Sequence, residues 1–569
     1  MHKLRDASLE IVLIILIGGL IGATLAIVSN LFVIGVYWFE QQREASTLFS
    51  LTIGDQPLSF SSVIFLWIAA AIIVALKIGF GIARWTGPAD SIYAAHQINE
   101  PLDIKTGLAS TLAAFTAASG GGSVGQYGPL VHFGATMGIW VKRFVSSRLS
   151  HEVYLGCGVA AAISAGFNAP IAGVIFAHEA ILRHFSVRTI APITVASISA
   201  SALSHQWFPH SITFEISAVV PPLAEIVPVL VVLAPLFSLV AVCFMWALRY
   251  SSKSASTLSL RVKSSALLLP FIAATICGLV GVWIPQILGL GFSSINNMIA
   301  GEFTLSLLIA VLIAKLLMTA LCIGFGLFGG VVSPSLFIGV ATGALAGQLL
   351  TVFGFANIAS IISVAGMAAV TSAVIGAPIT AVIIVLELTQ SYPYAVAVMV
   401  SVMLCSLITN RLFGHSFFDR QLLDRGIDLL KGREAIALRQ MSIGSFSDQN
   451  HVRAAVQSTG QNLCEQMQSR GQTEAYIVDD EGILLGKISL YAALEAADSS
   501  IESFMDTRPT ILYSHNSLED AMLKVRQFVG ESLPVVNAET GELEGSITEG
   551  GLFQAVTDVQ NQARTLERA

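Results

Sequence analysis

The amino-acid sequence predicts a polytopic, all-α membrane domain built of two related halves, followed by a smaller α/β region. The first sign is composition. Hydrophobic residues make up 54% of the 569 residues, charged residues make up 12%, and the mean hydropathy is +0.74, which soluble domains do not reach. The second sign is an internal repeat across the hydrophobic part. The third is a change of composition near residue 430, after which 139 residues hold 20 of the 37 acids and 11 of the 30 bases, as in a soluble acidic region.

The first two hydrophobic segments are long enough to cross a bilayer. Residues 11–39 are apolar and follow Lys3 and Arg5, and residues 62–82 form a second apolar stretch beyond a more polar connection at 41–56. The early basic residues favour a cytoplasmic amino terminus, and we expect the acidic region to be cytoplasmic as well. The sequence therefore predicts an integral, multi-pass protein of a plasma or inner membrane.

The repeat is visible in two places. Residues 158–171 align with residues 366–379 at a constant offset of 208, and residues 125–129 align with residues 330–334 at an offset of 205. Two matches in the same order at nearly the same offset indicate two related halves. Repeats of this kind are expected in transporters and channels, where each half contributes broken helices to a shared site.

A glycine-rich break precedes the first of these helices. Residues 120–131 contain five glycines, and Pro129 is typical of the first position of a helix. The first N–H groups of a helix have no carbonyl partners and carry a partial positive charge, so they attract anions. At membrane depth, irregular backbone is tolerated where it is buried in protein or lines a polar cavity. The break predicts an anion site or pore, and the alternative is a close packing of helices at residues 120–122.

These motifs resemble those of the CLC family of chloride channels and chloride/proton antiporters. Four family motifs have counterparts here, namely GREGP at residues 125–129, GxFxP at 330–334, GSGIP at 86–90, and an SIY-like stretch at 416–418. The resemblance covers the whole chain. It implies an inverted-repeat membrane domain that forms a homodimer in the lipid bilayer, with one anion pathway per subunit.

The resemblance also implies a division of the chain. We place the membrane domain at residues 1–425, with a first half at about 1–190 and a second half at about 191–425. Residues 426–441 are charged and helical in pattern, and they read as a linker. Residues 442–569 form the soluble region.

By the same resemblance, the anion pathway is lined by three helix starts and the end of the last apolar helix. The residues concerned are Gly87, Gly125, Gln126, Tyr127, Gly128, Gly330, Val331, Val332 and Phe418. Side-chain donors are few, because Gly87, Val332 and Phe418 replace a serine, a phenylalanine and a tyrosine of the family pattern. Backbone amides and the Tyr127 hydroxyl remain as donors, and they suit a weakly hydrated anion such as chloride, bromide or nitrate.

The departures from the family pattern predict the type of transport. In CLC antiporters the GREGP glutamate gates the outer anion path and carries the proton, and an inner glutamate relays protons. Tyr127 takes the first position here, and a phenol, with an ordinary pKa of about 10, stays protonated at neutral pH. The alignment places Ala180 on the inner glutamate and Glu179 one position before it. We therefore expect a passive chloride channel or uniporter, with Tyr127 as the candidate gate.

Two other interpretations stay open. One is a chloride/proton antiporter that uses another acid, such as Glu179. Glu179 and its repeat counterpart Glu387 lie at helix ends, where we expect them to pair with bases or to face water. The other is a weakly conducting membrane sensor that acts through its soluble region, with Tyr127 as a permanent plug. His132 and His178 are interpreted as hydrogen-bonded interior histidines, not as proton relays.

The soluble region contains two similar units. Residues 463–489 and 518–548 each read as a helix, a strand, an acidic turn with glycine and a second strand. They resemble a pair of CBS domains, which CLC proteins often carry at this place. CBS pairs that bind adenine nucleotides hold the ribose with an aspartate, and the corresponding positions here are Ala492 and Gly551. We therefore expect a structural or dimer-stabilising role without nucleotide control.

Other functions are not indicated by the sequence. The six cysteines lack the spacing of a metal or redox site and read as buried thiols. Signatures of a catalytic nucleophile, a metal centre or a basic nucleic-acid-binding patch are absent from the sequence, so we expect no enzyme, no cofactor, no metal and no nucleic-acid partner.

Overall fold

The computed structural model describes residues 2–46, 50–53, 56–97, 102–145, 149–208, 222–261, 265–354, 358–497, 499–526, 528 and 530–568. The chain forms two compact units. One unit holds Met1–Ala95 and Glu100–Gly426, and the other holds His96–Asn99 and Ile427–Ala569. The first unit is helical apart from one short hairpin, and the second is a mixture of helices and strands.

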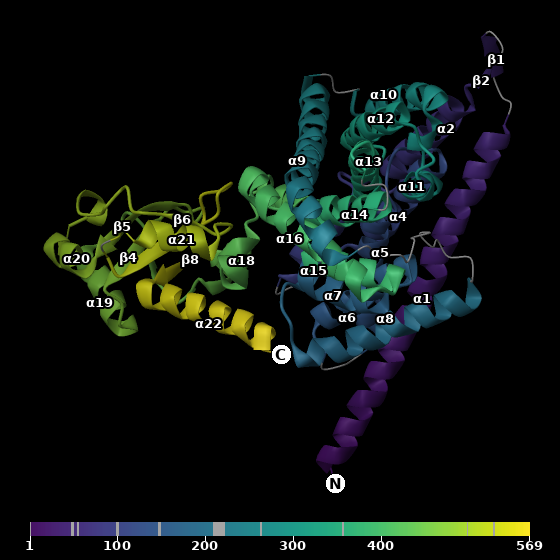
Figure 1. Ribbon diagram of the computed structural model, residues 1–569. Helices are drawn as coiled ribbons and strands as arrows, with labels where there is room; N and C mark the ends of the chain where they lie inside the picture. Colours follow the sequence, from purple (N-terminus) through teal and green to yellow (C-terminus); the bar gives the residue numbers. More distant parts are fainter. Residues whose placement is uncertain are drawn as a thin grey trace. The chain divides into compact units, whose positions relative to one another are not determined.

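The elements of the first unit follow one another along the chain from purple to green in Figure 1. The first half contains α1 (His2–Ala45), the hairpin β1 (Ser50–Ile53) and β2 (Gln56–Ser59), α2 (Ser61–Gly79), α3 (Pro88–Ala95), α4 (Ile104–Ser119), α5 (Tyr127–Phe144), α6 (His151–Phe167), α7 (Pro170–Phe176) and the π-helical turn η1 (Ala177–Leu182). The second half contains α8 (Val187–Trp207), α9 (Leu223–Arg261), α10 (Ser265–Trp283), η2 (Pro285–Ile287), α11 (Phe292–Ile299), α12 (Leu305–Gly324), α13 (Val332–Thr351), α14 (Ala359–Ile375), α15 (Pro378–Thr389), α16 (Tyr392–Phe413) and α17 (Phe417–Leu423).

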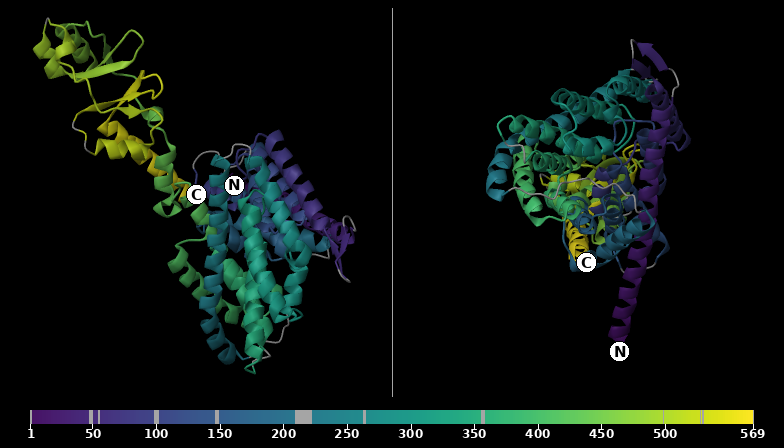
Figure 2. Two further views of the ribbon diagram at one scale, coloured as in Figure 1. Left: turned by 90° about the horizontal axis from the view of Figure 1, so that it is seen from above. Right: turned by 45° about the vertical axis from the view of Figure 1, so that its right-hand side comes forward.

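Seven helices of the described residues are long and apolar enough to cross a membrane. They include α1, whose amino-terminal end projects past the neighbouring helices in the right-hand view of Figure 2. The hairpin of β1 and β2 lies in the segment that the sequence suggested only as a polar connection. Four more apolar helices have 10–17 residues, which agrees with the broken, short segments of the sequence. The chain is an integral, multi-pass membrane protein.

The repeat is visible in how helices end. Asn168 ends α6 and Gly376 ends α14, both in the left-handed region at φ 52° and φ 75°, and a proline then starts α7 and α15. Asparagine and glycine are the residues that adopt this conformation most readily. The same short break therefore redirects the chain at equivalent places in both halves.

Equivalent glycines also pack the helix pairs together. A Cβ atom on Gly134 of α5 would lie 2.2 Å from the Gly158 carbonyl oxygen of α6, and one on Gly339 of α13 would lie 2.4 Å from the Gly366 oxygen of α14. Backbone therefore packs against backbone in both pairs, which small residues permit in membrane helices. This packing fixes where α5 and α13 begin.

The second unit consists of two copies of one topology. The first copy contains β3 (Val452–Ala454), α19 (Gly460–Arg470), β4 (Glu474–Val478), β5 (Leu484–Ser489) and α20 (Leu490–Ala496), and the second contains β6 (Leu512–Tyr513), α21 (Leu518–Val525), β7 (Ser532–Val536), β8 (Leu543–Thr548) and α22 (Glu549–Arg568). In each copy the first strand pairs parallel with the second, and the second pairs antiparallel with the third. Shorter elements complete the unit: η4 (Leu429–Lys431), α18 (Gly432–Gln440), η5 (Ile443–Phe446) and η6 (Ile501–Ser503).

Candidate functional site

The two predicted motifs meet at their glycines. Gly125 and Gly330 exchange two backbone hydrogen bonds, each 2.7 Å from nitrogen to oxygen, and so place the starts of α5 and α13 side by side. A Cβ atom on Gly330 would lie 2.8 Å from the Gly128 nitrogen and 2.9 Å from the Pro129 Cδ atom. The contact admits no side chain at this point, which explains why both motifs carry glycine there.

This bridge also limits which amides are free for an anion. The N–H groups of Gly125 and Gly330 are bonded to each other, although the sequence suggested amides near Gly125 as ligands. The first internal hydrogen bonds of the two helices run from Leu130 to the Gln126 carbonyl (3.1 Å) and from Ser335 to the Val331 carbonyl (3.0 Å). The N–H groups that open α5 and α13 precede these bonds, and they are the amides that remain for an anion.

Tyr127 is packed inside the protein. Its side chain is 1% exposed, its ring stacks on Phe167 with centroids 3.9 Å apart, and it meets the edge of Phe292 at 6.1 Å. The hydroxyl donates a hydrogen bond to the Gly166 carbonyl oxygen at 3.2 Å. The hydroxyl proton is donated to Gly166 in this conformation, so its donation to an anion stays a prediction that requires this bond to break.

Gln126, the neighbouring residue of the motif, is fully buried. Neither its Nε2 nor its Oε1 atom has a hydrogen-bond partner among the residues described here. A buried primary amide without a partner destabilises the folded protein, since its N–H and C=O groups lose hydrogen bonds to water and form none within the protein. Its position at the start of α5 makes it a candidate ligand within the predicted pathway.

A small cavity of about 70 Å³ lies beside the Gly125–Gly330 bridge. Four of the predicted pathway residues line it, namely Gly87, Gly330, Val331 and Phe418. Val332, also predicted, lines a separate apolar cavity together with Phe167. The structure thus brings four of the nine predicted residues to one cavity and places the Val332 side chain at another.

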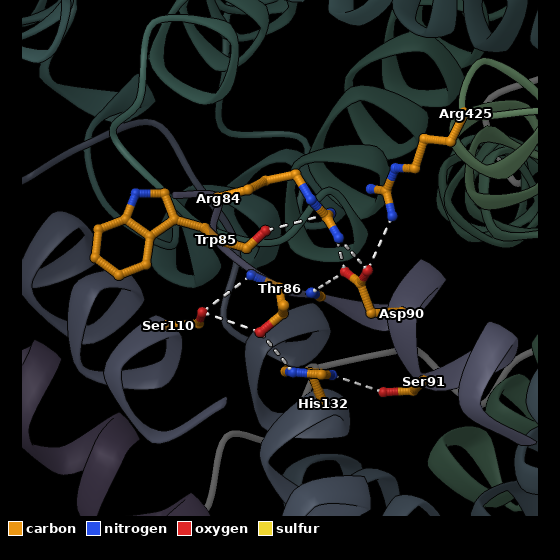
Figure 3. Close-up of polar contacts among 9 residues, drawn as sticks. Arg84, Trp85, Thr86, Asp90, Ser91, Ser110, His132 and Arg425 are labelled. Carbon is orange, nitrogen blue, oxygen red and sulfur yellow. Dashed lines mark hydrogen bonds and ion pairs between the residues drawn. The ribbon is translucent and has the colours of Figure 1, made fainter. Parts of the chain in front are cut away.

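Charged residues form part of the lining of the small cavity, and Figure 3 shows the polar contacts among them. The Asp90 carboxylate accepts hydrogen bonds from the Arg84 NH2 at 2.6 Å, the Arg425 NH1 at 2.8 Å and the Gly87 backbone N–H at 2.8 Å. The backbone N–H of Gly87, a predicted pathway residue, is thus bonded to a carboxylate. With two guanidinium groups against one carboxylate, the residues around this mouth keep a net positive charge, which suits an anion.

The sequence interpretation missed Arg84 and Arg425 as site residues. The only signal was position, because Arg84 precedes the GSGIP-like motif by two residues and Arg425 follows the last apolar helix. Both arginines bind Asp90, and Arg425 is 335 residues away from it in the chain. No local sequence pattern encodes such a contact.

His132 is hydrogen-bonded on both sides, as the sequence predicted. Its Nδ1 atom lies 2.8 Å from the Ser91 hydroxyl, and its Nε2 atom lies 2.8 Å from the Thr86 hydroxyl (Figure 3). The imidazole therefore ties α3 and the loop before it to α5. His178 is buried and hydrogen-bonded on one side, since its Nδ1 atom lies 2.8 Å from the His184 carbonyl oxygen, while its Nε2 atom has no partner within the described part of the chain.

Glu179 and Glu387 cap helices of opposite halves. The Glu179 carboxylate accepts the N–H groups of Ile379 and Thr380 at the start of α15, at 2.8 and 2.7 Å. The Glu387 carboxylate accepts the N–H groups of Ile171 and Ala172 at the start of α7, at 2.9 and 2.8 Å. Helix amides take the place of the bases that we expected as partners, and both glutamates remain partly exposed, in keeping with the other expectation that they face water.

The family resemblance predicts that Ala180 stands at the position of the inner glutamate. Ala180 is 3% exposed and lies in the π-helical turn η1. A π-helical turn is a local widening that often occurs at functional positions. No carboxylate is present at this turn other than Glu179, which is occupied with α15.

Comparison with known proteins gives the family. Residues 82–410 match the sequence model of the voltage gated chloride channel family, and residues 501–558 match that of the CBS domain. The chain belongs to the voltage gated chloride channel family. Together with the repeated topology of the second unit, the match shows a CLC-type membrane domain followed by a CBS pair.

Curated relatives include both transporters and channels by name. The chain is 27% identical over 382 residues to the H(+)/Cl(−) exchange transporter ClcA of Vibrio parahaemolyticus, which covers 64% of this chain and 81% of that protein. It is 25% identical to a putative chloride channel protein, ClcB-like, of Ralstonia nicotianae, over 64% of this chain and 86% of that protein.

Solved structures of CLC proteins share the fold. A slow cyanobacterial Cl⁻/H⁺ antiporter aligns with a TM-score of 0.63 at 18% identity, covering 73% of this chain and 97% of that chain. A eukaryotic CLC transporter aligns over 95% of this chain and 97% of that chain, with a TM-score of 0.58 at 19% identity.

Proposed function

We propose that this CLC protein is a passive pathway for chloride and similar monovalent anions, a channel or uniporter, and that it works as a homodimer with one pathway per subunit. One observation carries the proposal. The two positions at which the family resemblance places proton-carrying glutamates hold Tyr127 and Ala180. Neither side chain can exchange a proton near neutral pH as a carboxylate does.

The geometry supports an anion path in this place. An anion entering beside Arg84 and Arg425 meets a mouth of positive charge and then the amides that open α5 and α13. Amide dipoles replace part of the water shell of a weakly hydrated anion without holding it too tightly. Tyr127 would close the path in the packed conformation, and its ring would have to leave Phe167 for an ion to pass.

The alternative is exchange of chloride for protons, as the name of the Vibrio relative states for that protein. The acid available for it is Glu179. Its carboxylate accepts two amide N–H groups and the Thr380 hydroxyl, so releasing it to carry protons would uncap α15. Because these hydrogen bonds hold the Glu179 carboxylate in place, they favour conduction that is not coupled to protons. A third possibility, a sensor whose Tyr127 never moves, predicts no flux at all.

The CBS pair is proposed to stabilise the dimer without binding nucleotide. Ser489 and Thr548 cap α20 and α22 by accepting the N–H groups of Ala492 and Gly551, at 3.3 and 3.0 Å. Neither Ala492 nor Gly551 offers a carboxylate for a ribose hydroxyl. We propose that both termini are cytoplasmic, in a plasma or inner membrane.

The deciding experiment is chloride efflux from liposomes that hold the purified protein. External pH is recorded while a potassium gradient and valinomycin set the voltage. We expect rapid efflux without stoichiometric proton movement. Proton movement that reverses with the imposed voltage would refute the passive pathway and turn attention to Glu179. No flux in either the parent or a Tyr127→Ala protein would favour the sensor.

A further inference from the structure

A second, larger cavity of about 620 Å³ lies between α9 and α17 in the membrane domain. Four basic residues line it, namely Arg249, Lys253, Arg420 and Arg425, with Asp424 as the one acid. The cavity is on the side where the chain leaves the membrane domain, since Arg425 directly precedes its last residue. Its volume lies in the range of pockets that hold small organic ligands.

The basic groups are only partly neutralised. Arg249 donates two hydrogen bonds to Asp424, at 2.9 and 2.8 Å, which uses both carboxylate oxygens. The Arg420 Nε atom lies 3.5 Å from the same carboxylate and makes no hydrogen bond. Lys253 has no ion pair within the described residues. Lys253 is thus left for a ligand, and Arg420 shares the single Asp424 carboxylate with Arg249.

The arrangement along α9 suits an oxyanion. Arg249 and Lys253 are four residues apart and Ser252 also lines the cavity, whereas the Ser256 hydroxyl at the same cavity donates to the Lys253 carbonyl oxygen at 3.3 Å. Residues at this spacing lie on one face of a helix, so charge and hydroxyl donors face the same cavity. Guanidinium and ammonium groups with neighbouring hydroxyls are the donors that phosphate groups prefer.

The large cavity adjoins the small one. Phe417, Gln421 and Arg425 line both, and Arg425 is the residue whose NH1 holds Asp90 at the mouth of the anion path. A negative group in the large cavity competes with Asp90 for Arg425 and cancels positive charge at the mouth. Such a ligand lowers the local concentration of chloride.

We propose that the large cavity binds a phosphate-bearing ligand, either the headgroup of an anionic lipid or a soluble phosphate compound, and that the bound ligand slows anion flux. The proposal that a ligand binds depends only on the observations at the large cavity. The effect on flux rests on the proposed function.

Binding is tested on the full-length protein in detergent. The soluble probe is inorganic pyrophosphate, measured by isothermal titration, and the lipid probe is phosphatidylglycerol against phosphatidylcholine, measured as lipid retained in native mass spectrometry. In the variant Lys253→Gln with Arg420→Gln, we expect about tenfold weaker binding or more, because charged hydrogen bonds are lost. A control, Arg261→Gln with Arg411→Gln, removes two exposed bases that do not line the cavity, and we expect it to bind as the parent does.

Each result of the binding test either identifies the kind of ligand or overturns the site. Binding of pyrophosphate alone identifies a soluble ligand, and retention of phosphatidylglycerol alone identifies a lipid headgroup. Binding of neither probe by the parent, or an equal loss in the control variant, overturns the site.

Flux is then measured in phosphatidylcholine liposomes, with and without the probe that bound. We expect the probe to slow chloride efflux several-fold in the parent and to leave the cavity variant unaffected. Unchanged efflux in a parent that conducts and binds the probe overturns the regulatory effect. A parent that conducts no chloride overturns the proposed function and the effect on flux, while the binding result stands by itself.

Discussion

The packing of Tyr127 predicts how much its side chain holds the path closed. Replacing it with phenylalanine removes one neutral hydrogen bond, to the Gly166 carbonyl, worth about 0.5–1.5 kcal/mol. If opening requires that bond to break, the ratio of closed to open protein falls about two- to twelvefold. Tyr127→Ala also removes the contacts with Phe167 and Phe292, each worth about 0.5–1.5 kcal/mol. The ratio of closed to open protein then falls about ten- to a thousandfold.

The assay is the initial rate of chloride efflux from liposomes, normalised to the amount of folded dimer. Tyr394→Phe is the matched control, because Tyr394 is 1% exposed on α16 and its hydroxyl has no hydrogen-bond partner among the described residues. We expect the order Tyr127→Ala, then Tyr127→Phe, then parent, with the control equal to the parent. Equal rates for the parent and both Tyr127 variants would refute the reasoning, since the ring would then not limit flux.

Three further changes test other parts of the site. Gly330→Ala places a Cβ atom within 3 Å of neighbouring backbone, so we expect a lower melting temperature and chloride efflux reduced by about tenfold or more, whereas Gly19→Ala, in open space, should change neither. Glu387→Gln weakens the cap of α7, so we expect a lower melting temperature and efflux still uncoupled from protons; the appearance or loss of proton coupling contradicts this. Asp90→Asn removes the negative charge at the mouth, so we expect chloride to bind about two- to fivefold more tightly at low salt and equally at 1 M salt, measured from the chloride dependence of efflux.

The sequence predicted the elements that depend on local chemistry. Glycine and proline spacing located the starts of α5 and α13, and the two offsets implied that these starts belong together, which the Gly125–Gly330 bridge confirms. The CBS pair was predicted because each copy carries its own alternation of helix, strand and glycine turn. In both cases the pattern lies within a few tens of residues.

The parts that sequence reasoning missed depend on contacts between distant segments. Asp90 is held by Arg84, six residues away, but also by Arg425, which follows the last apolar helix. Glu179 and Glu387 appeared to be equivalent acids at helix ends, yet each caps a helix of the opposite half. The direction of the Tyr127 hydroxyl depends on where Gly166 ends up after folding. None of these partners is adjacent in the chain.

These distant contacts also bear on why the path would not couple to protons. A carboxylate that carries protons has to leave its partners, change charge and return in each cycle. Glu179 and Glu387 would each have to release two amide N–H groups of the opposite half. With hydrogen bonds to a charged group worth about 1.5–3 kcal/mol each, that release costs about 3–6 kcal/mol and also uncaps a helix. Moving the Tyr127 ring costs about 1.5–4.5 kcal/mol by the contacts counted above and leaves both halves joined. The two ranges overlap, but the lower one belongs to the Tyr127 ring, which supports the proposal that this ring and not a carboxylate is the moving part.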